Sequence, residues 1–318
     1  METQWISYIL QNFPMLESLP FPLAIAAHDA GAANHIIAWF KYLANQQSKL
    51  IHRSVTVCVA DPALSLWLRA FPDSKTSNLS NLLSDAKLLI SGTGWQSNLE
   101  HDTRKLARSL GIKSVAVIDH WTNYRDRFIR DDEEVLPDEI WVTDKYAKKL
   151  AENYFPDLRI VQLPNLYLEN ILSEVRLQEA SVNSSITTRL LYVLEPIRQV
   201  WGNGDQLGEF QALDFLIKNI NLLGFGENLS IKLRPHPSDP IGKYDQWIES
   251  QKNLDVSLDD SRTLAEAIAW SNVVVGCQTY AMVVALASGR QVICSIPPRV
   301  ATCVLPQTEI IKLADLIS

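Results

Sequence analysis

The sequence has few cysteines, no long apolar run and no excess of positive charge. Its four cysteines form no C-x-x-C pair, and three of them lie in apolar, strand-like runs. This favours reduced, mostly buried thiols in a cytoplasmic protein. No apolar run approaches the roughly 18 residues that a membrane span needs, and the first residues lack the basic start of a signal peptide. We therefore expect a cytoplasmic protein, or one bound peripherally at the inner membrane face.

The charge and the composition exclude further classes. A net charge of −7 argues against broad nucleic-acid binding, although it leaves room for a local basic pocket. The chain has no low-complexity tract and no internal repeat of about 20–50 residues. With 318 residues, 47% hydrophobic and 20% charged, it resembles an ordinary folded protein of two domains or one large one.

The N-terminal stretch predicts one amphipathic helix. Four apolar residues fall on one helical face before Pro14: Ile6, Ile9, Leu10 and Phe13. The stretch carries almost no Lys or Arg to hold it on a membrane surface. We therefore expect this helix to pack on the domain that follows.

From Leu23 onward, short β-rich runs alternate with helical stretches. The predicted strands are Leu23–Ala27, Val55–Ala60, Leu88–Ser91, Ser114–Ile118, Glu139–Thr143 and Arg159–Leu163. The predicted helices between them are Ala32–Asn45, Ala63–Phe71, Ser97–Leu110 and Asp144–Tyr154. Strands that are apolar throughout, separated by amphipathic helices, indicate a parallel sheet covered on both faces.

The alternation pauses between about Pro164 and Thr188, where a charged helix is followed by a linker rich in Ser, Thr and Asn. It then restarts with the predicted strands Arg189–Leu194, Leu229–Leu233, Asp255–Leu258, Asn272–Gly276 and Gln291–Ser295. The predicted helices are Glu209–Leu222, Tyr244–Ser250, Thr263–Trp270 and Tyr280–Ser288. We predict domains at 1–180 and 181–318.

This pattern predicts an α/β protein with two doubly wound, Rossmann-like domains facing a central cleft. Open α/β sheets bind ligands outside the carboxyl ends of their strands, and clefts between domains are favoured sites. The residues that follow each strand are therefore the first candidates for function.

In the first half, polar and cationic groups follow three strands. "HDAGAAN" after the first strand brings His28 and Asp29 to a tight turn of small residues. "SGTGWQSN" follows the third strand, and "DHWTNYRDRF" after the fourth carries Asp119 and His120 with two aromatics and two arginines. None of these turns reads G-x-G-x-x-G, so no dinucleotide cofactor is predicted. Helix capping or core packing explains any one turn alone, but not all three together.

In the second half, "SIKLRPHPSDP" stiffens the backbone around one arginine and one histidine. Arg234 and His236 both precede a proline, which holds each of them extended. A cationic fork and an imidazole preset in this way suit an anion such as phosphate. The alternative is a strand exit with a histidine satisfied inside a loop.

Two other turns of the second half offer groups that bind anions. "EPIRQVWGNGDQ" supplies Arg198 and an N–H-rich "GNG". "GCQTYA" supplies Gln278 and Thr279 before a helix N-terminus. We predict a nucleotide-phosphate receptor in this half.

With these residues in view, the chain resembles a small GT-B glycosyltransferase of bacterial surface-polysaccharide biosynthesis. It is most similar to the families with an "HP" motif: bacterial sialyl- and polysialyltransferases and teichoic-acid glycerophosphotransferases. The matching stretches are "RPHP" at 234–237 and "SNVVVGCQTYA" at 271–281. The resemblance implies that His236 contacts the donor phosphate, assisted by the later turn. That turn has Gln278 and Thr279 where these families have Ser-Ser or Thr-x-x-Ser, and their acidic catalytic motif has no counterpart here.

The resemblance implies transfer of a sugar from a nucleotide-sugar to a glycan or lipid-linked acceptor, with a membrane or polysaccharide-assembly partner. Such transfer needs cationic or N–H groups at the leaving phosphate and a base for the acceptor hydroxyl. The first need fits Arg198, Arg234, His236, Gln278 and Thr279. For the base we favour Asp29 or His28, followed by Asp119 and His120.

No D-x-D motif or ligand cluster is present in the sequence, so we expect metal independence and no cofactor beyond the nucleotide-sugar co-substrate. Two other functions fit the same fold. One is a nucleotide-sugar 2-epimerase or hydrolase, and the other is a glycosyltransferase-like binding protein without catalysis.

Overall fold

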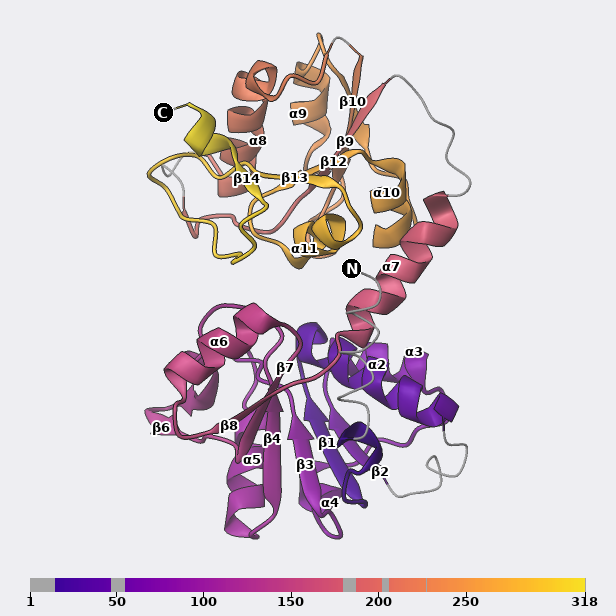
Figure 1. The fold of residues 1–318 in the computed structure, drawn as a ribbon, viewed down its shortest axis with the longest axis vertical. Coiled ribbons are helices and arrows are strands. Elements are labelled where there is room, and N and C mark those ends of the chain that lie inside the picture. The colour runs from indigo at the N-terminus through magenta and orange to yellow at the C-terminus, as the bar shows by residue number, and fades with distance from the viewer. Residues whose placement is uncertain (1–14, 47–54, 180–186, 202–205, 227, 318) are drawn as a thin grey trace. The chain divides into compact units, whose positions relative to one another are not determined.

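The structure is a computed structural model that describes residues 15–46, 55–179, 187–201, 206–226 and 228–317. The predicted N-terminal helix and the "GNG" at 202–204 lie outside these residues. The chain divides into two compact units, Met1–Tyr167 and Leu168–Ser318. Each unit holds one parallel sheet with helices (Figure 1).

The first unit is built on a six-stranded sheet in the order β2-β1-β3-β4-β7-β8. All of its pairings are parallel. Its strands are β1 (Leu23–Ala27), β2 (Val55–Val59), β3 (Leu88–Ser91), β4 (Lys113–Val117), β7 (Glu139–Val142) and β8 (Arg159–Gln162). Its helices are α2 (Ala30–Gln46), α3 (Ala63–Ala70), α4 (Leu79–Leu82), α5 (Leu99–Ser109) and α6 (Lys145–Tyr154).

Both faces of this sheet are buried. Ile25 and Ala27 of β1 pack into a core with residues of α2, whereas Ala24 and Ala26 pack on the other face with Ala107 of α5. This is why β1 is apolar at every position, since alternate side chains of a strand enter opposite layers. Between β4 and β7, a 3₁₀ turn (Asp126–Phe128) leads into a small hairpin of β5 (Ile129–Arg130) and β6 (Glu133–Glu134).

The second unit is also built on a six-stranded parallel sheet, in the order β11-β10-β9-β12-β13-β14. Its strands are β9 (Thr188–Val193), β10 (Leu229–Arg234), β11 (Asp255–Leu258), β12 (Val273–Gly276), β13 (Gln291–Cys294) and β14 (Ile311–Lys312). α7 (Leu166–Glu179) begins in the last residues of the first unit and continues into the second. The other helices of the second unit are α8 (Gly208–Asn219), α9 (Asp245–Ser250), α10 (Leu264–Trp270) and α11 (Tyr280–Ala287), with 3₁₀ turns at Ile220–Leu223 and Leu313–Leu316.

Local sequence signals explain several helix starts in the two units. The Asp144 carboxylate accepts hydrogen bonds from two N–H groups of the first turn of α6, and the Thr263 hydroxyl accepts one from Glu266 N at the start of α10. Both are standard N-cap residues. The Thr279 hydroxyl caps α11 in the same way.

The predicted fold class is confirmed: the chain forms two doubly wound α/β domains. Every predicted strand is present, and each begins and ends within one residue of its predicted bounds. The sequence analysis missed α4, the β5–β6 hairpin and β14, because elements of two to four residues are too short to show a periodic pattern. In the described part of the chain, no helix combines the length and the apolar character that crossing a membrane requires.

Candidate functional site

Three loops of the first unit meet at the carboxyl ends of β1, β3 and β4, which are neighbours in the sheet. In the sheet, β2 lies on one side of β1 and β3 lies on the other. The chain therefore passes first to one side of β1 and then to the other. Ligands of open α/β sheets bind at such a switch point. His28 and Asp29 directly follow β1 and therefore lie there.

Asp119, which follows β4, lies over Gly31 at the start of α2. A Cβ atom on Gly31 would lie only 1.7 Å from Asp119 Oδ2. No other residue at position 31 would allow this approach. The small residues of "HDAGAAN" therefore bring a carboxylate of β4 against the N-terminal turn of α2.

Arg127, in the 3₁₀ turn, holds Asp119 in place. Its Nη1 lies 2.9 Å from Asp119 Oδ1 and donates to Thr93 Oγ1 at 3.0 Å, while its Nε donates to the Thr122 carbonyl. Burial alone would raise the pKa of Asp119, but the Arg127 guanidinium and the nearby imidazoles outweigh it and lower that pKa. Asp119 is therefore an ionised anchor.

Asp29 has the opposite electrostatic character. Burial, and then repulsion from Asp119, raises the pKa of its carboxyl from 3.8 to about 6. Its Oδ1 accepts a hydrogen bond from Ala32 N at 3.0 Å. Its Oδ2 is buried without a hydrogen-bond partner among the described residues. A Cβ on Gly94 would lie 2.7 Å from this oxygen, so the loop after β3 closes tightly on it.

Glu100 completes an acidic cluster with Asp29 and Asp119. It is fully buried in the first turn of α5, and its Oε1 accepts a hydrogen bond from His28 N at 2.7 Å. Burial raises its pKa. The Arg104 guanidinium, also buried, donates to the Gly92 carbonyl at 2.9 Å and so fixes the loop beside the cluster.

His120 lies beside this acidic cluster. Burial lowers its pKa, although Asp119 opposes the shift. Its Nδ1 is 3.3 Å from Thr122 Oγ1, and its ring lies against Trp121. The structure thus brings Asp29, Asp119 and His120 to one strand edge, with His28 tied to the same cluster through Glu100.

In the second unit, the segment 234–240, here called the histidine turn, follows β10. Hydrogen bonds between His236 and Asp239 hold this segment in a turn. The Asp239 Oδ2 accepts from His236 N at 3.1 Å, and Asp239 N donates to the His236 carbonyl at 2.8 Å. Ser238 N donates to His236 Nδ1 at 3.1 Å. Since Nδ1 accepts, the neutral ring carries its proton on Nε2.

The protonation state of His236 follows from its surroundings. Burial, together with the positive charges of Arg198 and Lys243, lowers its pKa, and Asp239 only partly opposes this. The ring is therefore neutral at pH 7 and carries one N–H donor, on Nε2. Arg234 ends β10 and is extended, as the proline after it predicted, whereas the chain turns back directly after His236, whose own extended backbone stays a prediction.

A buried ion network supports the histidine turn. Lys243 contacts both Glu209 of α8 and Asp239, and all three side chains are at most 10% exposed. Tyr244 donates to Asp239 Oδ2 at 2.9 Å. The second Glu209 oxygen accepts from Arg198 N at 2.6 Å. The network therefore links the loop after β9 to the turn after β10.

Arg198 has a left-handed backbone, with a φ of 52°. This conformation is unfavourable for a residue other than glycine, and such strain often marks a functional loop. Its charge contributes to the lowered pKa of His236.

Gln278 and Thr279 follow β12, which neighbours β9 on the side away from β10. Gln278 N donates to Glu195 Oε1 at 2.6 Å, and burial raises the pKa of Glu195 to about 7. The Gln278 Oε1 is buried and has no hydrogen-bond partner among the described residues. The candidate groups of the second unit therefore follow three adjacent parallel strands.

Arg234 is the exception among the predicted groups. Its Nη1 pairs with Asp259, whose side chain is fully buried, and also donates to the Ser261 carbonyl at 3.2 Å. This guanidinium edge ties β10 to the loop after β11. The contact of Arg234 with a phosphate stays a prediction. In the structure this side chain also has a structural role, through its contacts with Asp259 and Ser261.

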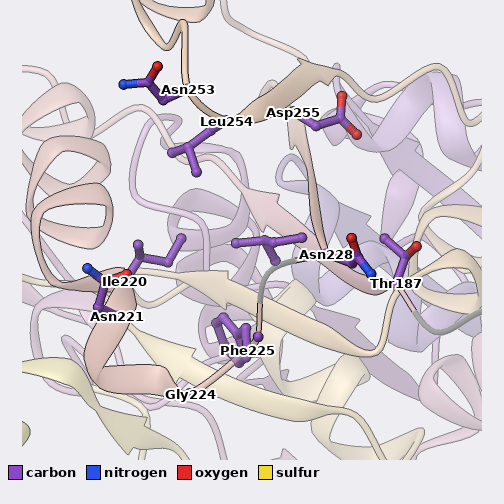
Figure 2. Close-up of a pocket in the computed structure, with 11 residues that line it drawn as sticks. Thr187, Ile220, Asn221, Gly224, Phe225, Asn228, Asn253, Leu254 and Asp255 are labelled. Carbon is purple, nitrogen blue, oxygen red and sulfur yellow. The ribbon is translucent and has the colours of Figure 1, made fainter.

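One pocket of the second unit lies away from these groups. A pocket of about 630 Å³ opens at the amino ends of β9, β10 and β11 (Figure 2). Thr187, Phe225, Asn228 and Asn253 line it with seven other residues. It contains no predicted site residue. We favour the carboxyl edge as the functional site, because that is where open α/β sheets bind ligands.

Several residues of the two clusters were not singled out from the sequence. Glu100, Glu209 and Lys243 look like ordinary helix or loop charges, and Arg127 was seen only as one of two arginines. In the described part of the chain, no group of three or more His, Cys, Asp or Glu side chains is arranged to hold a metal ion.

Comparison with solved structures identifies the architecture. The UDP-GlcNAc 2-epimerase of Neisseria meningitidis bound to UDP-GlcNAc matches with a TM-score of 0.58 and 12% identity, over 89% of this chain and 84% of that one. The UDP-forming α,α-trehalose-phosphate synthase of Burkholderia xenovorans matches with a TM-score of 0.51 and 10% identity, over 93% of this chain and 90% of that one.

The chain has a GT-B-like fold. The UDP-GlcNAc 2-epimerase of Methanocaldococcus jannaschii matches too, with a TM-score of 0.56 and 12% identity over 86% of this chain and 83% of that one. No family model matches the sequence, and no curated protein matches it. At these identities the likeness establishes the fold, while the roles of the candidate site residues stay predictions.

Proposed function

We propose that this chain is a GT-B glycosyltransferase that moves a sugar from a nucleotide-sugar donor to a hydroxyl of a glycan or lipid-linked acceptor. In this proposal the N-terminal domain (1–180) receives the acceptor and the C-terminal domain (181–318) binds the donor. The proposal rests above all on Asp29, a carboxyl of raised pKa with one unpartnered oxygen at a strand switch point.

Asp29 is the proposed base. A base is most effective when its pKa lies near the working pH, because it is then largely deprotonated and still takes up a proton readily. The pKa of about 6 meets this condition, whereas the lowered pKa of Asp119 makes that carboxylate a weaker base. His28 and His120 flank Asp29 and Asp119 as secondary candidates. In this assignment Asp119 and Arg127 hold the geometry.

The donor phosphates are proposed to bind at the histidine turn. His236 Nε2–H donates to a phosphate oxygen, and Arg198 supplies the positive charge. Gln278 and the capped start of α11, at Thr279, contribute further donors, and Arg234 lies within the same turn. Charge on the departing phosphate is then stabilised by fixed protein groups, so we propose that transfer needs no metal ion.

A nucleotide-sugar 2-epimerase or hydrolase is the second candidate. It is favoured by the structural likeness to two proteins described as UDP-GlcNAc 2-epimerases. Both candidates use the same donor site and differ only in what reaches the sugar. A glycosyltransferase-like protein that binds the nucleotide-sugar without turning it over is the third candidate.

Product analysis distinguishes the candidates. The full-length protein is incubated with a panel of nucleotide-sugars, with and without fractions of bacterial surface glycan and lipid-linked saccharide, and the products are separated and identified by mass. We expect free nucleotide to form only when acceptor is present, in EDTA as well as in buffer. Epimerised or hydrolysed donor without acceptor would favour the second candidate. Nucleotide-sugar that binds but stays intact in every mixture would favour the third.

A further inference from the structure

Three of the four cysteines gather at the carboxyl edge of the second sheet. Cys277 follows β12, Cys294 ends β13, and Cys303 lies in the segment after β13. The Cys294 thiol donates to the Cys277 carbonyl at 3.1 Å, and the Cys303 thiol donates to the same oxygen at 3.4 Å. The two thiols therefore share one hydrogen-bond acceptor.

The two sulfurs have unequal environments. Cys294 is 3% exposed, whereas Cys303 is partly exposed. The neighbouring Cys294 thiol, helped by Leu305 N–H and the charge of Lys312, lowers the pKa of Cys303 to about 7. The neighbouring Cys303 and burial raise the pKa of Cys294. Thiolate character therefore falls on the more accessible sulfur, which is the pattern of a reactive cysteine beside a resolving one.

We propose that Cys303 and Cys294 form a peroxide-sensitive dithiol that closes reversibly to a disulfide. The Cys303 thiolate attacks one oxygen of hydrogen peroxide, the O–O bond breaks, and sulfenic acid and hydroxide form. The hydroxide takes the proton of Cys294, whose sulfur then attacks the Cys303 sulfur and expels the second hydroxide. That hydroxide combines with the proton first lost by Cys303, so two thiols and one peroxide yield one disulfide and two waters.

Two other roles for these thiols fit the structure less well. A metal site is one, but within the described ranges no Cys, His, Asp or Glu group is arranged to hold an ion. Simple packing is the other, and it suits Cys58 of the first unit, which is 8% exposed and has a pKa raised by burial. Packing does not explain why Cys303, partly exposed, shares an acceptor with a second thiol.

The position gives the reaction a structural consequence. A disulfide removes both S–H donors from the Cys277 carbonyl, which immediately precedes Gln278 and the start of α11. It also closes the loop 294–303, in which Arg299 has a φ of 69°. Oxidation of the pair should therefore change the hydrogen bonding of the strand edge that carries Gln278 and Thr279.

The experiment uses the full chain, first reduced and then freed of reductant. Hydrogen peroxide is added, free thiols are blocked with N-ethylmaleimide, and peptides are identified by mass before and after dithiothreitol. We expect a Cys294–Cys303 linked peptide that dithiothreitol cleaves, and an unmodified Cys58. In the reduced protein at pH 7, Cys303 should react with N-ethylmaleimide at least about tenfold faster than Cys58, because only the thiolate is nucleophilic.

Single substitutions separate the two roles. Cys294→Ser should stop the reaction at a sulfenic acid on Cys303, which dimedone traps, and Cys303→Ser should leave Cys294 a free thiol after peroxide. The proposal is overturned if wild-type Cys303 stays a thiol under peroxide, or if it links only to another chain. Both of these outcomes are measured on the wild type. The test therefore remains decisive even if a variant fails to fold.

Discussion

In the first unit, Asp29 keeps one buried carboxylate oxygen without a hydrogen-bond partner among the described residues, whereas in the second unit the groups beneath His236 pair with one another. The acidic cluster raises the pKa of Asp29 at the expense of folding stability, since repulsion and burial both oppose its charge. The histidine turn gains stability from its ion network. The comparison suggests that the first site is made to take a proton and the second to hold a ligand in a preset geometry.

The largest expected effect lies in the acidic cluster. Asp29→Asn preserves the shape but removes the proton acceptor, so turnover should fall by roughly 10²–10⁴-fold. Donor affinity, measured by calorimetry, should change little, because the proposed donor groups belong to the second unit. Full activity of Asp29→Asn beside inactive His28→Ala or Asp119→Asn would move the base to another residue.

The second effect tests the network beneath the histidine turn. Lys243→Met leaves Glu209 and Asp239 buried without their cation, and breaking such a pair costs about 3–5 kcal/mol of unfolding free energy. Denaturant unfolding measures this loss. Lys232→Met is the matched control, because its partner Asp260 is 84% exposed and the pair should contribute at most about 1 kcal/mol. Equal losses in the two variants would mean that the network does not stabilise the turn.

The smallest expected effect concerns the stability of the folded protein, which the charged form of Asp29 lowers. Because folding raises its pKa from 3.8 to about 6, the folded state holds the proton more tightly than the unfolded state. The resulting stabilisation is complete below pH 3.8, falls as the pH rises, and is lost above about pH 6. Asp29→Asn should therefore melt a few degrees above the wild type at pH 8.

At pH 5 the two proteins should melt at nearer temperatures, because the folded wild type is then largely protonated at Asp29. Melting curves across this pH range measure the difference. A variant less stable than the wild type at pH 8 would show that the charged Asp29 stabilises the fold, contrary to its raised pKa.

The sequence predicted where the candidate site residues lie in the fold better than how they pair. His28, Asp29 and Asp119 were found because an apolar strand has a visible end, and the ends of parallel strands share one edge. Glu100 was missed, since a charged residue in the first turn of a helix is ordinary until the fold buries it against His28. Arg127 was noticed, but its pairing with Asp119 depends on a 3₁₀ turn without a sequence signal.

The histidine turn shows the same difference between a predicted position and an unpredicted pairing. Three prolines predicted its stiffness, but not that Arg234 would turn to Asp259 or that Ser238 would fix the tautomer of His236. The pairing of Lys243 with Glu209 joins residues far apart in sequence, and its cause is tertiary packing. Propensity and spacing carry no information on such contacts.

The most direct test of the account measures phosphate recognition by His236. Nucleoside diphosphates are first screened by thermal shift, since a ligand of the folded state raises the melting temperature. The best one and its phosphate-free nucleoside are then titrated calorimetrically into the wild type, His236→Ala and His236→Gln, which keeps an N–H donor. The nucleoside serves as the control, because it cannot use a phosphate contact.

The account predicts that His236→Ala binds the diphosphate about 10- to 150-fold more weakly than the wild type, as expected for one lost charge-assisted hydrogen bond of about 1.5–3 kcal/mol. His236→Gln should recover part of this loss, and the nucleoside should bind all three proteins alike. If His236→Ala folds normally and binds the diphosphate as tightly as the wild type, the histidine turn is not the phosphate site.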